Sequence, residues 1–127
     1  MRQAISSPEA PRAIGPYSPA VRLGNLLFVS GQIPIDPLTG SIAGPDITAQ
    51  TDQVMRNIGA LLRAAGLGFE HVVRTTVFLT DITEFAAMNE RYGVFVGDPP
   101  PARSTVQVAR LPRDVKVEID AIAVIPG

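Results

Sequence analysis

The 127-residue chain contains no cysteine and no tryptophan, and it has a single histidine, His71, and a single lysine, Lys116. The lack of cysteine excludes disulfides and a thiol nucleophile, and one histidine leaves almost no soft ligands for a transition metal. We therefore expect no metal site. Catalysis by this chain must use oxygen groups and the guanidinium groups of arginine.

Long apolar runs and an excess of one charge are also missing. No stretch approaches the ~20 apolar residues of a membrane-spanning helix, and residues 1–8 lack the apolar region of a secretory signal. We therefore expect a cytoplasmic protein with no membrane partner. The 11 Lys+Arg against 12 Asp+Glu give a net charge of −1, which offers no electrostatic reason to bind nucleic acid.

Residues 1–127 fit a single domain without a linker or an internal repeat. Helical spacing of apolar residues predicts one helix from Thr48 to Gly66 and a second that Asp81 caps and Gly97 ends. The apolar stripes are Val54, Met55, Ile58, Leu61, Leu62 and Ala65 in the first helix, and Phe85, Met88, Tyr92 and Phe95 in the second.

Alternating apolar and polar residues predict strands at 3–5, 21–23, 26–30, 71–79, 104–108 and 115–124, with Gly24-Asn25 as a hairpin turn. Two amphipathic helices can cover one face of such a sheet. We predict an α+β fold, a two-layer sandwich in which a mixed sheet of about six strands is covered on one face by two helices. Apolar strand residues such as Val21, Phe28, Phe78 and Val106 cannot all face two helices, which indicates a buried oligomer face.

A candidate site lies in the last two predicted strands. Because a short proline-containing connection joins residues 104–108 to 115–124, we expect an antiparallel pair with Arg103 at its edge and Glu118 within side-chain reach. Glu118 alternates with apolar neighbours, so it lies away from the apolar face. An arginine fork binds carboxylates and a nearby carboxylate can move protons, so the two suit a small anionic substrate. A surface Arg–Glu pair is the alternative interpretation.

Motifs over nearly the whole chain are similar to those of one family. Pro101-Ala-Arg-Ser104 and Val117-Glu-Ile119 resemble the signature of the Rid family of reactive-intermediate deaminases, also called YjgF-type proteins. Further landmarks follow in the family's order: Ile14-Gly-Pro-Tyr-Ser18, Leu23-Gly-Asn25, Ser30-Gly-Gln-Ile-Pro34, Asp36-Pro-Leu-Thr-Gly40, Gln50, Ala64-Ala-Gly66 and Thr75-Thr-Val-Phe78.

The resemblance implies a chorismate mutase-like fold and a homotrimer with ligand pockets in the clefts between subunits. It implies an enzyme, a 2-iminobutanoate/2-iminopropanoate deaminase, which hydrolyses reactive enamines and imines to 2-oxo acids and ammonia and needs no cofactor. By the same resemblance, Arg103 binds the substrate carboxylate, and Glu118 positions a water and exchanges its proton.

The resemblance also assigns further residues to substrate binding: Tyr17, Ser30, Gly31, Asn89 and Thr105. Ser30 is not a credible nucleophile, because no nucleophile-elbow motif surrounds it. Gly31 lets a ligand or another backbone approach closely. Thr105 stands where many family members have a cysteine, so the role that we expect there belongs to its backbone groups.

Three other functions remain open on the sequence. A non-catalytic module that binds small carboxylates or metabolites and regulates a partner would keep Arg103 but tolerate the loss of Glu118. A ribonuclease or translation inhibitor, activities attributed to some relatives, would have to act without a catalytic histidine pair. Lys116 could form a Schiff base, although an exposed strand lysine is much commoner.

Overall fold

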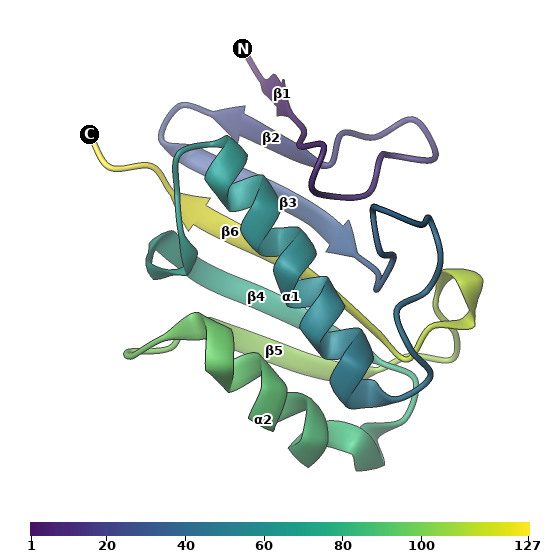
Figure 1. Cartoon of the computed structure of the whole chain (residues 1–127). Helices are drawn as coiled ribbons and strands as arrows, with labels where there is room; N and C mark the ends of the chain where they lie inside the picture. Colours follow the sequence, from purple (N-terminus) through teal and green to yellow (C-terminus); the bar gives the residue numbers. More distant parts are fainter.

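Six strands form one mixed sheet, and two helices pack next to each other on one of its faces (Figure 1). The computed structural model describes all residues, 1–127. The elements in chain order are β1 (Gln3–Ile5), β2 (Ala20–Leu23), β3 (Leu26–Gln32), α1 (Ile47–Ala64), β4 (Val72–Leu79), α2 (Phe85–Val96), β5 (Ala102–Gln107) and β6 (Val117–Val124). Across the sheet the strands follow the order β1-β2-β3-β6-β4-β5. The predicted two-layer α+β sandwich is confirmed.

The predicted pairing of the last two strands is wrong. β5 pairs in parallel with β4, with Arg103 opposite Thr75, and β6 pairs with the other edge of β4 in antiparallel register. The reason is the connection through α2, because a strand–helix–strand unit places its two strands parallel to each other. The chain between β5 and β6 forms a 3₁₀ turn, Pro112–Asp114, rather than a tight hairpin. β6 therefore inserts between β3 and β4.

The first half of the sheet agrees with the prediction. β1 pairs with β2 and β2 pairs with β3, both in antiparallel register. Gly24 has a φ of +61°, a conformation that glycine adopts without steric cost, and it forms the predicted hairpin turn together with Asn25.

α1 confirms the first predicted helix and begins one residue earlier than predicted. The Asp46 carboxylate caps it by accepting a hydrogen bond from the Ala49 N–H at 2.8 Å. Gly66, at φ +76°, follows its end, and the Leu67 N–H then donates to the Leu62 carbonyl at 2.8 Å. All of the predicted apolar stripe lies in the core or packs against it.

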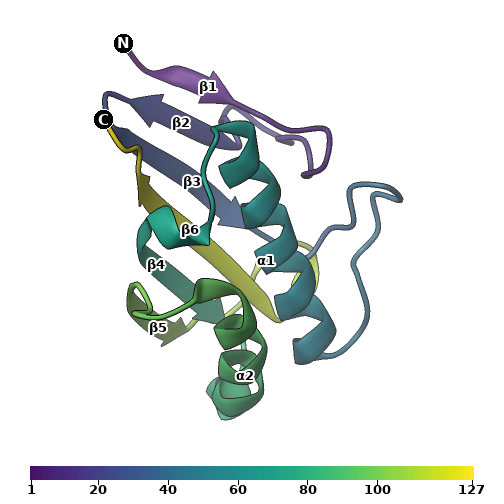
Figure 2. The same cartoon turned by 60° about the vertical axis from the view of Figure 1, so that its left-hand side comes forward.

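α2 begins later than predicted, because Asp81 caps a 3₁₀ turn instead. Its carboxylate accepts from the Thr83 N–H at 2.9 Å, and the α-helix starts only at Phe85. Phe85 and Phe95 of the predicted stripe are half-buried rather than buried. α2 covers the sheet edge that β5 forms, where it has α1 as a neighbour on one side only (Figure 2). Neither helix is both long and apolar enough to cross a membrane.

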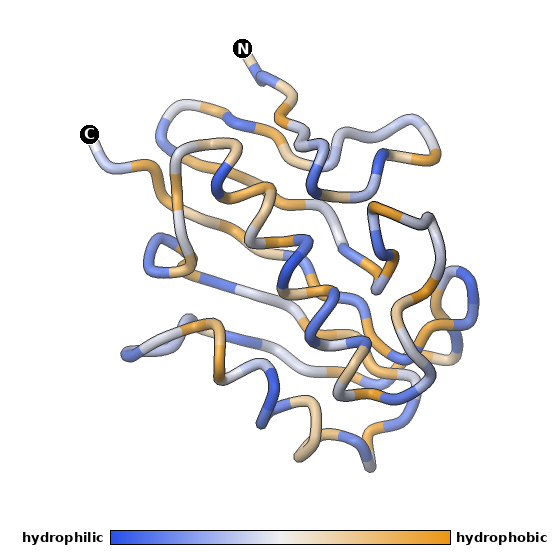
Figure 3. The backbone as a smooth tube through the Cα atoms, viewed as in Figure 1, coloured by the Kyte–Doolittle hydropathy of each residue, from blue (hydrophilic) through white to orange (hydrophobic).

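The core fills the layer between the helices and the inner face of the sheet. Apolar residues recur along α1 and along the central strands β3 and β6 (Figure 3). In β6 every second residue from Val117 is buried, and the residues between them face the side that no helix covers. On this open face Phe28 and Val106 remain 40% and 43% exposed, which confirms that apolar strand residues are left uncovered by the two helices.

A buried asparagine ties α1 to the segment that follows β3. The Asn57 amide donates to the carbonyl of Ile33 at 3.2 Å and to that of Ile35 at 3.0 Å. Its Oδ1 accepts from the Gln53 side chain at 2.8 Å. Since the segment runs directly on from Gly31 and Gln32, this anchor fixes the end of β3 that the candidate site uses.

We expect Asn57→Ala to lower the free energy of unfolding by roughly 2–4 kcal/mol, because the carbonyls of Ile33 and Ile35 each lose the hydrogen bond from the buried amide. Urea denaturation measures this. Gln53→Ala is the matched control, since it removes only the bond to Asn57, and its cost should be clearly smaller. Equal costs for the two variants would contradict the anchoring role.

Candidate active site

Arg103 points into the helix layer. It lies on β5 opposite Thr75, which is buried, and its guanidinium carbon is 5.0 Å from the ring centroid of Tyr92 and 5.4 Å from that of Phe85. Both rings belong to α2. None of the chain's six ion pairs includes Arg103. The half-buried cation is therefore free to bind an external anion.

A groove of about 430 Å³ opens beside this arginine. Asn89, Tyr92 and Gly93 of α2 line it, together with Pro100 and Pro101 of the segment before β5. The Asn89 Oδ1 is buried without a hydrogen-bond partner. The structure thus brings Arg103 and Asn89 together, as the sequence predicted for substrate binding.

Thr105 lies two residues beyond Arg103 on β5, and its side chain faces the same side of the sheet. The Thr105 Oγ1 is buried and has no hydrogen-bond partner. The hydroxyl is therefore inaccessible to solvent, and the backbone role expected at this position stays a prediction.

Glu118 lies on the open face of the sheet. It is opposite Phe78 of β4, and its carboxylate rests against Gly31 of β3. A Cβ added to Gly31 would come within 2.9 Å of the Glu118 Cδ, so the carboxylate occupies the space that a side chain would fill. Burial raises the pKa of Glu118 above the ordinary value of 4.5, and the negative charge of Asp120 raises it further.

A second, small groove lies beside Gly31, and Tyr17, Gln32 and Ile33 help to line it. The Ser30 hydroxyl donates to the Ser18 carbonyl at 2.7 Å, so it holds the Tyr17 segment against the end of β3. The structure thus brings Tyr17, Ser30 and Gly31 together, with the Glu118 carboxylate against the glycine.

The predicted residues therefore form two half-sites, which we name by their charges. The arginine half-site contains Arg103, Asn89 and Thr105, and the glutamate half-site contains Glu118 with Tyr17, Ser30 and Gly31. The expected side-chain reach between Arg103 and Glu118 is not found within one chain. β4 separates their strands, and the two side chains point to opposite faces of the sheet.

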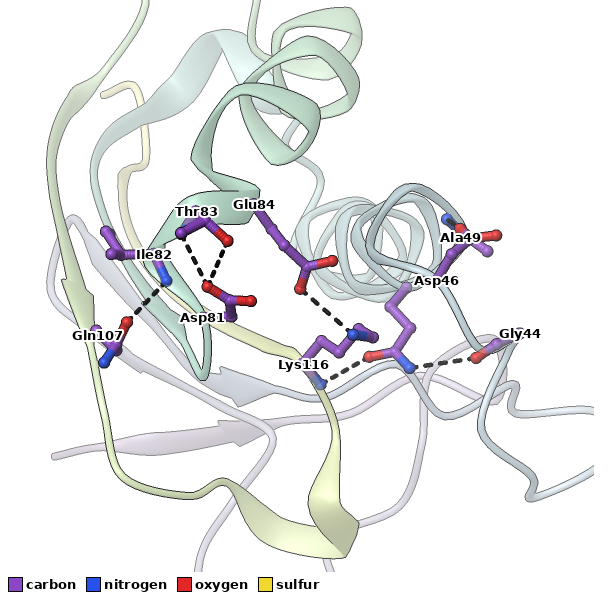
Figure 4. Close-up of polar contacts among 10 residues, drawn as sticks. Gly44, Asp46, Ala49, Asp81, Ile82, Thr83, Glu84, Gln107 and Lys116 are labelled. Atoms are coloured by element: carbon purple, nitrogen blue, oxygen red, sulfur yellow. Dashed lines mark hydrogen bonds and ion pairs between the residues drawn. The ribbon is translucent and has the colours of Figure 1, made fainter.

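The single lysine and the single histidine lie outside both half-sites. Lys116 precedes β6, and its Nζ lies 3.4 Å from the Glu84 Oε1 while its backbone N–H donates to Gln50 (Figure 4). The His71 Nδ1 accepts from the Gly68 N–H at 3.0 Å in a short turn before β4. Both side chains therefore have structural partners. No cluster of three or more histidine, cysteine, aspartate or glutamate side chains is arranged to hold a metal ion.

Known proteins resemble this chain over almost its full length. A family model described as endoribonuclease L-PSP matches residues 7–125. Protein DfrA of Myxococcus xanthus is 57% identical over 125 residues, which cover 97% of this chain and 95% of that protein. The 2-iminobutanoate/2-iminopropanoate deaminase of Salmonella typhimurium is 49% identical over 127 residues, 98% of each chain.

Solved structures agree with these sequence relatives. The crystal structure of E. coli TdcF with bound serine has a TM-score of 0.94 at 46% identity and covers 98% of this chain and 99% of that one. The YjgF gene product of E. coli has a TM-score of 0.92 at 48% identity, with 96% and 98% covered. The chain belongs to the Rid family. This confirms the resemblance to the Rid family that the sequence motifs indicated.

Two residues near the half-sites of this Rid protein were missed by the motif analysis. Tyr92 was assigned to the apolar stripe of α2, yet its ring also lies against Arg103. Asp120, which accepts from the Thr76 N–H at 3.1 Å, lies on the strand face of Glu118 as the alternation predicts, but its effect on the pKa of Glu118 was not anticipated. A signal existed for Tyr92, because a buried tyrosine hydroxyl requires a partner. For Asp120 the signal was its place two residues from Glu118 on one strand face.

Glu118→Gln should leave this Rid protein as stable as the wild type, or more stable, at pH 8. Because the pKa of Glu118 is raised on folding, the stability that its protonated form contributes is lost as the pH rises through the folded pKa. The greater stability of the Glu118→Gln variant should be present above the folded pKa of Glu118, and it should disappear below the ordinary pKa of 4.5.

Urea denaturation at pH 4 and pH 8, at one protein concentration, measures this difference. Glu90→Gln, on an exposed part of α2, is the matched surface control. A Glu118→Gln variant that is clearly less stable than the wild type at pH 8 would show that the carboxylate is a structural group.

Proposed function

We propose that this protein is a cytoplasmic deaminase that hydrolyses 2-imino acids, among them 2-iminobutanoate and 2-iminopropanoate, to 2-oxo acids and ammonia without a cofactor. The proposal depends on one observation about Arg103. This half-buried arginine lies beside a groove, and it has no carboxylate partner in its own chain. These substrates have one carboxylate, which matches one free guanidinium fork. A relative with 49% identity bears the name of this activity.

The proposed site is completed between subunits of a homotrimer. The arginine and glutamate half-sites lie on opposite faces of one sheet, so a substrate that contacts both must lie between two chains. The open face also leaves apolar side chains such as Phe28 and Val106 exposed, and association would bury them. One subunit would supply Arg103, Asn89 and the backbone at Thr105.

The neighbouring subunit would supply the glutamate half-site. There the backbone at Gly31 and the Tyr17 hydroxyl would contact the substrate, and Ser30 would support them. The Glu118 carboxylate, in its place against Gly31, would hold a water over the C=N carbon.

The proposed reaction needs one proton-transfer group and a fixed substrate. Arg103 holds the carboxylate, and water adds to the iminium carbon while Glu118 accepts the proton that the water loses. The resulting carbinolamine receives that proton on nitrogen, and the C–N bond breaks as Glu118 takes the proton of the hydroxyl, which becomes the 2-oxo group. Ammonia takes this last proton and leaves as ammonium, so Glu118 is ionised again. A pKa raised above the ordinary value suits a carboxylate that both takes and returns a proton.

A trapping assay tests the function. Threonine dehydratase or an amino-acid oxidase generates the imino acid, and semicarbazide traps what has not hydrolysed. The wild-type protein should lower the semicarbazone yield catalytically, and Glu118→Gln should lose roughly 10²–10⁴-fold in rate, as expected for a positioned acid–base group.

Two controls make this assay decisive. Calorimetry with 2-oxobutanoate, the product of 2-iminobutanoate, should show that Glu118→Gln still binds a carboxylate, and Thr105→Cys should change the rate little. A wild-type protein that leaves the semicarbazone yield unchanged with several imino acids would favour the alternative, a non-catalytic module that binds small carboxylates. An active Glu118→Gln variant would keep the deaminase but contradict the proposed role of Glu118.

Mixed assemblies test the shared site. Arg103→Ala and Glu118→Gln subunits should each be inactive alone, whereas refolding them together in equal amounts should restore about one quarter of the wild-type sites, since each site draws one half from each of two neighbours. Light scattering should give a trimer mass. If both variants are inactive alone, no recovery in mixed trimers of verified mass would mean that the two residues act within one chain and would contradict the shared site.

A further inference from the structure

The helix layer holds Arg103 in a way that carboxylate binding does not by itself explain. Its guanidinium carbon lies 5.0 Å from the ring centroid of Tyr92 and 5.4 Å from that of Phe85. A cation above a ring face is attracted to the negative charge of the π-system. We infer that Tyr92, tethered by Thr75, is a positioning residue that orients the Arg103 fork toward the substrate carboxylate. This inference rests on the proposed function in that Arg103 binds that carboxylate.

Thr75 holds the Tyr92 ring in place. The two hydroxyl oxygens are 2.7 Å apart in a buried contact, and Thr75 is only 2% exposed. Thr75 also lies directly opposite Arg103 in the β4–β5 pair. The same two strands therefore carry the arginine and the group that fixes the ring beside it, so the ring and the guanidinium keep one relative position.

An aromatic contact orients the cation without neutralising it. A carboxylate in the place of Tyr92 would occupy the planar fork of Arg103 and would compete with the substrate. A ring face leaves the five N–H donors of the guanidinium available for hydrogen bonds in the plane of the fork. Tyr92 lines the groove beside Arg103, so the free fork and the groove adjoin each other.

Substitutions at Tyr92 separate the ring from its tether. Tyr92→Leu removes the π face, and we expect KM for the imino acid and Kd for 2-oxobutanoate to rise roughly 2–30-fold, the range of one cation–π contact. The value of kcat should change much less, because the lost contact is made equally in the bound substrate and in the transition state. Tyr92→Phe keeps the ring and should give a smaller rise in KM.

A double-mutant cycle tests the tether. Thr75→Val should raise KM as much as Tyr92→Phe does, and the double variant should show no further rise, because both changes remove the same hydrogen bond. If Tyr92→Leu does not fold, the double-mutant cycle by itself tests whether Tyr92 and Thr75 position Arg103. Equal and non-additive rises support the tether, and unchanged KM and Kd in both single variants overturn it.

Phe95→Leu is the matched control, because Phe95 lies on the same helix and contacts Phe69 and Arg91 instead of Arg103. It should leave KM and Kd unchanged. Unchanged values for Tyr92→Leu, or an equal rise for Phe95→Leu, would overturn the inference and leave Tyr92 as a core residue.

Arg103→Lys distinguishes this failure from failure of the proposed function. It should weaken 2-oxobutanoate binding by roughly 5–150-fold, because it keeps the charge and loses the planar fork. If Arg103→Lys weakens binding and Tyr92→Leu does not, only the positioning role fails. If Arg103→Lys leaves binding unchanged, Arg103 is not the carboxylate clamp, and both proposals are overturned.

Discussion

The place of β4 between β5 and β6 is the constraint on which the rest of this structure depends. Side chains alternate across a sheet, so register alone decides that Arg103 joins the helix layer and that Glu118 joins the open face. No change of rotamer can move a side chain through the sheet. Within one chain the cation and the carboxylate therefore remain apart, and chemistry that needs both requires a second chain. A second chain packed on the open face would also bury its exposed apolar residues.

Neither Arg103 nor Glu118 is paired with a side chain of opposite charge in its own chain. Arg103 rests on two aromatic rings and has no carboxylate, while Glu118 is desolvated beside another carboxylate and has no cation. Arg103 and Glu118 would stabilise each other electrostatically if they were close together, but the topology of the sheet keeps them apart. Unpaired charges of this kind are characteristic of functional sites, because the charge that the fold leaves unsatisfied is the charge that a ligand can satisfy.

The arginines of the outer helix surface provide the contrast. Arg56 of α1 and Arg91 of α2 each place a side-chain nitrogen 2.7 Å from the carboxylate of Asp52. Burial alone would raise the pKa of Asp52, but the hydrogen bonds and charges of the two arginines outweigh it and hold that pKa below its usual value. This bridge joins the two helices and so helps to place α2, with Asn89 and Tyr92, over β5. Arginines that build the scaffold have their carboxylate inside the chain, whereas Arg103 does not.

Most helices and strands could be predicted from the sequence, because hydrophobic periodicity, capping residues and turn glycines act over a few neighbouring positions. The stripe of α1, its end at Gly66, the hairpin at Gly24 and the two-layer class were all predictable in this way. Motif order was also sufficient to name the family, and the residues that it assigned to substrate binding lie in the two half-sites. The order of the strands in the sheet could not be predicted in this way, since alternation within a strand indicates which face each residue lies on but not which strand is its neighbour. The antiparallel pairing expected for Arg103 and Glu118 was wrong because α2 makes β5 a parallel neighbour of β4, and this long-range choice leaves no mark in either strand's own sequence.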